Sequence, residues 1–177
     1  NDFVRIALAN TDQRIQSGKS VSAGFLFATL LWPDLLSNWK KNIAKGISNI
    51  PALHDAMDET IASQSSGMVI QRRFESDMRE IWSMQPRFEK RVGRYPYRLI
   101  ESPRFRAGYD FMLLRCATGE KSPSLGQWWT DFITADPSGQ EALMASVKNE
   151  TGNSASPAKR RRRRKPKSAV PTEGAAD

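Results

Sequence analysis

The fold class of this chain is decided by the stretch Ser102-Pro-Arg-Phe-Arg-Ala-Gly-Tyr-Asp-Phe-Met-Leu-Leu-Arg-Cys-Ala-Thr-Gly-Glu120. On a helix with about 100° per residue, Phe105, Tyr109 and Met112 share one face, whereas Phe111 and Leu114 point well away from it. A helix that is apolar on two sides needs neighbours on both. The stretch therefore predicts the central helix of a helical bundle.

Helical periodicity continues on both sides of this stretch, and no segment alternates in the manner of a strand. We expect an all-α protein, an irregular bundle of about seven to eight helices over residues 1–148. The starts of these helices are predicted from caps, prolines and the first apolar position of each stripe. They fall near Asp2, Ser20 or Ser22, Pro51, Ile70, Tyr95, Pro103, Leu125 and Ser138.

Two prolines and one charge pair give more local predictions. Pro33 should introduce a bend or a new first turn after the apolar run that precedes it, and Pro86 should kink or end the fourth helix. On that fourth helix, Glu75 and Arg79 have the i,i+4 spacing that predicts an ion pair on its exposed face.

Positive charge is concentrated in two segments. The chain has a net charge of +8, and eight Lys or Arg against two Asp or Glu lie from residue 151 onward. Residues 87–106 hold seven more basic residues against Glu89 and Glu101. Charge placed in this way favours a specific anionic partner over general solubility.

The composition excludes several kinds of site. With one cysteine, Cys116, and one histidine, His54, neither an internal disulfide nor ordinary zinc-finger spacing is possible. Low cysteine content suits a reducing cytoplasm, and the longest apolar run is about half the roughly 20 residues that a membrane span needs, so we expect a cytoplasmic protein without a membrane partner. Because the chain has no Asp-x-Asp pair and no glycine-rich phosphate loop, no catalytic residue and no metal ligand is assigned.

The first basic segment interleaves cations with Phe88, Tyr95 and Tyr97. Single-stranded nucleic acid offers phosphates to cations and bases to aromatic rings, so this segment favours RNA contact; the alternative is a solvated helix face. The predicted RNA-binding residues of the bundle are Arg72, Arg73, Arg87, Lys90, Arg91, Arg94, Arg98, Arg104 and Arg106.

Two aromatic features allow either a binding or a core interpretation. Arg104, Phe111 and Arg115 fall within about 40° of one another on the helix, a stripe that could hold a phosphate and a base. The favoured interpretation places Phe111 in the core and pairs the arginines with carboxylates. For Trp128-Trp129, adjacent positions diverge by about 100°, so the two side chains should not enter one pocket, and at least one should pack in the core.

The second basic segment lies in a tail, residues 149–177, that we expect to be disordered because its composition cannot bury enough apolar surface to offset chain entropy. Its eight cations should bind a polyanion by counterion release, with a salt slope near −5 to −6 if all contact single-stranded phosphates, about −0.7 each. A nuclear localisation signal and a solubilising tail are the alternatives. The cations are Lys159, Arg160, Arg161, Arg162, Arg163, Arg164, Lys165 and Lys167.

The stretch from Ser102, the Trp128-Trp129 pair and the basic run Lys159–Lys165 resemble, in the same order, the C-terminal half of bacterial poly(A) polymerases. That family carries a Pro-[Arg/Lys]-Phe-Arg-Ala-x-Tyr-Asp-Phe pattern before a Trp-Trp pair and an Arg/Lys-rich tail. The segments Asn10-Thr11-Asp12-x-Arg14 and Phe25-Leu26-Phe27-Ala28 also resemble the family at matching places.

The resemblance implies that this chain is the RNA-binding portion of a polynucleotide adenylyltransferase, which adds AMP from ATP to RNA 3′ ends in mRNA polyadenylation and so promotes RNA turnover. It implies no cofactor here, and places ATP and Mg²⁺ in a missing N-terminal nucleotidyltransferase head. Expected partners are single-stranded RNA 3′ ends, that head, and RNA-decay or RNA-chaperone proteins. The alternatives are a stand-alone helical nucleic-acid-binding protein and the body of a tRNA CCA-adding enzyme.

Overall fold

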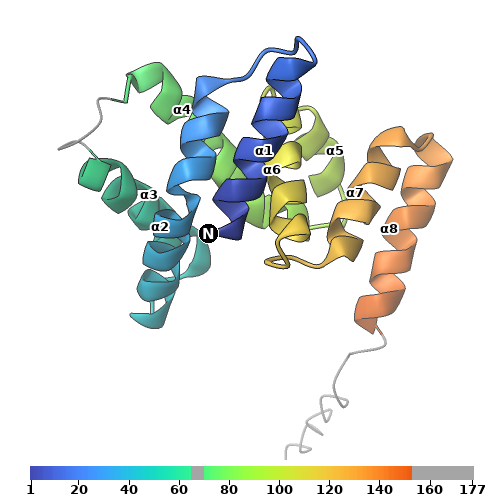
Figure 1. Ribbon diagram of the computed structural model, residues 1–177. Helices are drawn as coiled ribbons and strands as arrows, with labels where there is room; N and C mark the ends of the chain where they lie inside the picture. The colour runs from blue at the N-terminus through green and yellow to red at the C-terminus, as the bar shows by residue number, and fades with distance from the viewer. Residues whose placement is uncertain (65–69, 153–177) are drawn as a thin grey trace, which may run out of the picture.

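The computed structural model describes residues 1–64 and 70–152, with side chains as far as Lys148. Within these ranges the chain is helical and contains no strand, which confirms the all-α prediction (Figure 1). The helices are α1 (Asp2–Gln16), α2 (Ala23–Ala44), α3 (Asn49–Gln64), α4 (Arg72–Met84), the 3₁₀ helix η1 (Gln85–Glu89), α5 (Tyr95–Ile100), α6 (Phe105–Ala117), α7 (Pro123–Thr134) and α8 (Pro137–Gly152).

Helix α6, the centre of the quoted stretch, lies between two hydrophobic clusters. Its Phe111 and Leu114 belong to the first cluster, whose other members come from α1 to α4. Its Tyr109, Met112 and Cys116 belong to the second cluster, with residues from α4, η1, α5, α7 and α8. The two apolar faces therefore serve two separate cores, which confirms the predicted central position.

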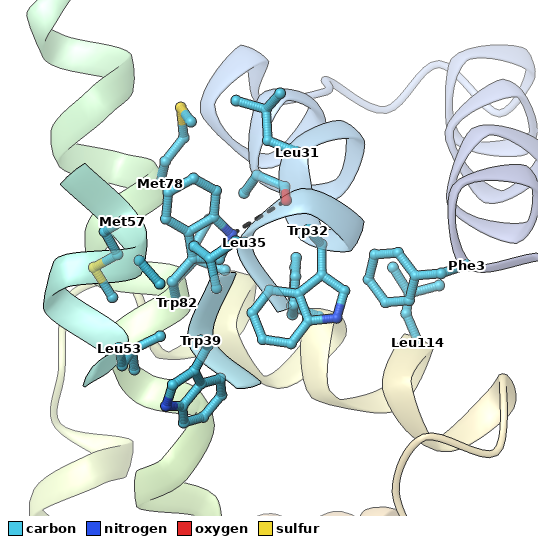
Figure 2. Close-up of a cluster of buried hydrophobic side chains, with 14 of the residues drawn as sticks. Phe3, Leu31, Trp32, Leu35, Trp39, Leu53, Met57, Met78, Trp82 and Leu114 are labelled. Atoms are coloured by element: carbon cyan, nitrogen blue, oxygen red, sulfur yellow. Dashed lines mark hydrogen bonds between the residues drawn. The ribbon is translucent and has the colours of Figure 1, made fainter. Parts of the chain in front are cut away.

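The first cluster is built around three tryptophans, Trp32, Trp39 and Trp82 (Figure 2). Trp82 of α4 is fully buried, and its indole Nε1 donates to the carbonyl of Ala28 at 3.2 Å, the dashed bond in Figure 2. A buried indole requires such a partner, because an unpaired N–H would lose its bonds to water. This bond fixes α4 against α2.

The second cluster contains both members of the Trp-Trp pair. Trp128 is 7 % exposed and Trp129 is fully buried, with ring centroids 5.1 Å apart. The prediction that at least one packs in the core is confirmed, and the two indoles reach different partners within this cluster. Neighbours surround α7 widely enough for both indoles to be buried: Trp129 donates to the carbonyl of Phe88 at 2.9 Å, and Trp128 donates to that of Leu143 at 3.2 Å.

Three local predictions are corrected. Pro33 does not start a new helix, because α2 runs through it from Ala23 to Ala44, with buried residues on either side; a bend at Pro33 stays a prediction. The cap of α1 is Asn1, whose side chain accepts from the amide of Phe3, and not Asp2. Arg79 does not pair with Glu75, since its Nη2 lies 2.7 Å from Asp58 Oδ1 on α3.

Several boundaries agree with the sequence. Ser22 caps α2, α4 ends just before Pro86, and Gly18 and Gly119 take positive φ after α1 and α6. Helix α8 extends to Gly152, beyond the Lys148 limit predicted for the bundle. Within the described residues, no helix combines the length and the apolar character required to cross a membrane.

Candidate nucleic-acid interface

The first basic segment forms η1, a turn and α5. We call Arg87, Lys90, Arg91, Arg94 and Arg98 the cationic segment. Its backbone is anchored from within, because Phe88, Pro96 and Leu99 are buried against the second cluster. Gly93 allows the turn by taking φ of 59°, a conformation that side chains rarely tolerate. The buried apolar positions turn the intervening basic side chains outward.

Four of the five cations in this segment are exposed: Arg87, Lys90, Arg94 and Arg98. Lys90 lies over the ring of Tyr95, with its Nζ 5.0 Å from the centroid. Arg91 is partly buried, and its guanidinium lies 5.5 Å from the Trp128 ring centroid. In the described part of the protein, the buried Nε of Arg91 has no hydrogen-bond partner. The segment thus presents four exposed cations within twelve residues.

The aromatic rings of this segment differ from the prediction. Phe88 is fully buried, and Tyr97 is partly buried with its ring 5.4 Å from that of Phe132, so these two do not form a stacking platform. Tyr95 is 52 % exposed and is the one ring of the three open to a base. The sequence could not distinguish them because all three are aromatics near arginines, and only tertiary packing selects which are buried.

The acidic residue inside the segment is neutralised by a residue that sequence reasoning missed. Lys121, which follows α6, forms an ion pair with Glu89. The pair removes a carboxylate that would repel phosphates. The two residues are 32 positions apart, so no local spacing indicated this contact.

The remaining predicted cations of the bundle are not gathered with the cationic segment. Arg72 and Arg73 are exposed in the first turn of α4, separated from η1 by the helix length, about 18 Å at 1.5 Å per residue. The guanidinium of Arg73 lies 4.6 Å from the Phe74 ring centroid. These two residues form a second basic position at the opposite end of α4.

Arg104 and Arg106 lie at the start of α6. The Arg104 guanidinium is bound to α4, with Nη2 2.5 Å from Asp77 Oδ1 and Nε 3.8 Å from Glu80 Oε2. Arg106 pairs with Asp110 at 3.1 Å, but its side chain is 79 % exposed. Both line a pocket of about 590 Å³ between α1 and α6. Arg104 has a structural partner, whereas Arg106 can turn towards a ligand without breaking a buried contact.

Arg115 and Phe111 are buried in the core, as the interpretation favoured in the sequence analysis predicted. Phe111 is fully buried, and its ring lies 5.1 Å from that of Trp32. The Arg115 side chain is 4 % exposed, and its Nε donates to Glu120 Oε1 at 2.8 Å. Neither side chain is available to a strand. The predicted tail cations from Lys159 to Lys167 lie outside the described residues.

Comparison with known proteins matches most of the chain to one family. The family described as "Polymerase A arginine-rich C-terminus" matches residues 45–167, which include the cationic segment and the arginine run. The chain belongs to this family.

The relatives that the chain matches are named poly(A) polymerase I. The chain is 31 % identical to the one from Salmonella typhi over 93 % of its own length and 35 % of the relative. It is 32 % identical to the poly(A) polymerase I of Escherichia coli O6:H1 over 96 % of its own length and 36 % of the relative. It is 31 % identical to that of Haemophilus influenzae over 78 % of its own length and 31 % of the relative. The chain thus spans about a third of the relatives that it matches.

Two further groups in this member of the family bear on chemistry. Burial raises the pKa of the Cys116 thiol above its ordinary value, so the sulfur is held in its protonated, unreactive form. His54, Asp55 and Asp58 are exposed on α3. No group of three or more His, Cys, Asp or Glu residues is arranged to hold a metal ion in the part of the chain that the structure describes.

Proposed function

We propose that this chain is the RNA-guiding, C-terminal portion of a polynucleotide adenylyltransferase that extends RNA 3′ ends with AMP from ATP. The observation that carries the proposal is the family match over residues 45–167, a region in which the helical bundle exposes four cations of the cationic segment. Single-stranded RNA would lie along the cationic segment, with phosphates on its guanidinium groups and a base on Tyr95.

The chemistry of transfer would belong to an N-terminal head, which would hold ATP and Mg²⁺ on paired carboxylates. The relatives are about three times as long as the matched region, which leaves ample length for such a head. We further propose a cytoplasmic location, a disordered basic tail that begins after α8 ends at Gly152, and RNA-decay or RNA-chaperone proteins as additional partners. The low cysteine content supports the location, and the concentration of charge supports the tail.

The proposal is tested by measuring the affinity of the chain for fluorescent single-stranded RNA across a salt series. The double variant Arg94→Ala and Arg98→Ala should make the slope of log affinity against log salt shallower by about 1.4, because each lost phosphate contact contributes about 0.7. The matched control, Lys40→Ala with Lys41→Ala on α2, removes the same charge from exposed positions elsewhere and should change the slope by much less.

A wild-type chain without measurable affinity for RNA in dilute buffer would contradict the proposal, as would equal effects of the two double variants. In the same preparation, incubation with ATP, Mg²⁺ and RNA should give no extension. Extension by this chain alone would place the transfer chemistry here and overturn the division proposed above.

A further inference from the structure

We infer that the pocket between α1 and α6 binds one nucleoside 5′-phosphate unit, with its base inside and its phosphate at the arginine rim. The inference deepens the proposed RNA binding by adding a base-recognising subsite, separate from the cationic segment. Figure 1 shows α1 crossing beside α6, and the pocket lies along this contact, closed at one end by the loop that joins α1 to α2.

The floor of the pocket is apolar and carries one aromatic ring. Leu114, 5 % exposed, and the partly buried Phe25, Ala107 and Leu113 supply it. The Phe25 ring is held by its edge contact with the buried Phe111, at 6.2 Å between centroids. A volume of about 590 Å³ falls within the range of about 300–1,000 Å³ usual for small-ligand sites, and a flat aromatic base suits such a floor.

The charged groups of the wall fit a phosphate better than a neutral or cationic ligand. Three arginines and one carboxylate, Asp110, line the wall; Arg104 is already paired with Asp77 and Glu80 of α4, which leaves Arg14 and Arg106 for a ligand. Arg14 is anchored at the rim because its Nη2 donates to the carbonyl of Ser20 at 3.3 Å, which occupies one of its five N–H groups. Arg106 is exposed, so its guanidinium can turn to a phosphate at the rim and bind it through two parallel N–H groups, the geometry in which arginine binds best.

The uncharged polar groups indicate which base is preferred. Asn10 and Gln13 of α1 line the pocket, and a side-chain amide can bond adenine at both its amino group and its ring nitrogen. The Asp110 carboxylate adds an acceptor for an exocyclic amine once Arg106 turns to a phosphate. Uracil has no such amine. The pocket therefore favours adenine over uracil.

The test blocks the pocket without changing charge. Ala117→Trp places a large ring at the exposed end of the pocket wall, and Ser37→Trp is the matched control on the exposed surface of α2. Affinities for oligo(A) and oligo(U) of equal length are measured by fluorescence anisotropy, and thermal melts check folding. Ala117→Trp should weaken oligo(A) binding by about five- to tenfold, the loss of one stacked base, and change oligo(U) binding by less than about twofold.

Asn10→Ala, at an exposed position, provides a second variant should the tryptophan disturb the fold, and it should reduce the preference for oligo(A) in the same direction. Titration with AMP, followed by the amide signals of Asn10 and Ala117, distinguishes a free mononucleotide from a nucleotide within a strand. Response to AMP without loss of oligo(A) affinity in the variants assigns the pocket to free nucleotide.

Unchanged oligo(A) affinity in both variants together with no response to AMP overturns the inference. That result differs from a failure of the proposed function, in which the wild-type chain itself would not bind either oligonucleotide. Equal weakening of oligo(A) and oligo(U) would also overturn it, because a site without base preference is only an extension of the phosphate-binding surface.

Discussion

Arg115 is the most deeply buried charged residue of the described chain, and a closed set of contacts satisfies it. Its Nη1 donates to Gln85 Oε1 at 3.3 Å, and its guanidinium carbon lies 4.8 Å from the Trp32 ring centroid. Glu120, its carboxylate partner, also accepts the Trp32 indole at 2.8 Å. One arginine thus ties α6 to α2, η1 and the turn after α6.

Arg115→Ala should lower the free energy of unfolding by about 3–5 kcal/mol, because removing one partner of a buried pair leaves the Glu120 carboxylate without its cation and Gln85 Oε1 without this donor. Urea denaturation followed by circular dichroism measures the loss. Arg5→Ala is the matched control. Arg5 pairs with Asp2, and their side chains are 72 % and 81 % exposed. This pair should contribute no more than about 1 kcal/mol to the free energy of unfolding. Similar losses of unfolding free energy in the two variants would show that the buried contacts of Arg115 are not the source of the stability lost in Arg115→Ala.

Cys116, the next residue, is 8 % exposed, and burial raises the pKa of its thiol. Because the folded pKa lies above the unfolded one, the protonated thiol stabilises the folded state fully below about pH 8.5 and progressively less as pH rises through the folded pKa. Relative to Cys116→Ala, the wild-type chain should therefore lose stability between neutral and alkaline pH, measured by urea melts. A pH-independent difference would contradict this assignment.

At the scale of elements, the contact of α2 with α4 depends on the absence of a side chain at Gly24. A Cβ there would lie 2.6 Å from Asp77 Cβ, and Asp77 in turn binds Arg104. In a helix, alanine is more favourable than glycine by about 1 kcal/mol. At position 24, however, the added Cβ would force α2 and α4 apart.

Gly24→Ala should therefore destabilise the fold by about 1–3 kcal/mol, the range for an overpacked contact. Gly126→Ala on α7 is the comparison. Its nearest neighbour is the terminal methyl Cδ2 of Leu113 at 3.0 Å, which can rotate aside. Thermal melts of the two variants should differ, and a Gly24→Ala protein as stable as wild type would show that the helices yield without cost.

At the scale of the whole molecule, positive charge is divided between the helical bundle and the C-terminal tail. The tail from residue 151 carries eight of the 27 basic residues, whereas the bundle displays its own cations at the two ends of α4 and at the pocket. If an RNA strand contacts both parts, the phosphate contacts of each part add to the slope of log affinity against log salt and can be removed separately.

Deleting Pro157–Asp177 should flatten the salt slope of RNA binding by several units, up to about 5 to 6 if all eight cations contact phosphates. Replacing Arg160, Arg161, Arg162, Arg163 and Arg164 by lysine keeps the charge and should keep the slope. Anisotropy titrations at several salt concentrations measure both. An unchanged slope after the deletion would remove the tail from the RNA-binding account.

Periodicity along the sequence was sufficient for the helices and for the central position of α6, since the two faces of that helix are visible in its spacing alone. It was also sufficient for the burial of Phe111. It failed for a new first turn at Pro33, where α2 is continuous with buried residues on both sides, and at Arg79, where Asp58 from another helix is the partner. In both cases a tertiary contact outweighed the local preference.

The sequence by itself determined the helical class and the location of charge, because these are set by composition and by spacings of three to four residues, and its motifs carried the resemblance to the family. The tertiary structure decided which arginines are available. It buried Arg115, bound Arg104 to Asp77, neutralised Glu89 with Lys121, and brought Arg14 to one pocket with Arg106. These contacts join residues separated by up to about 90 positions, and only the packing of helices brings such distant residues together.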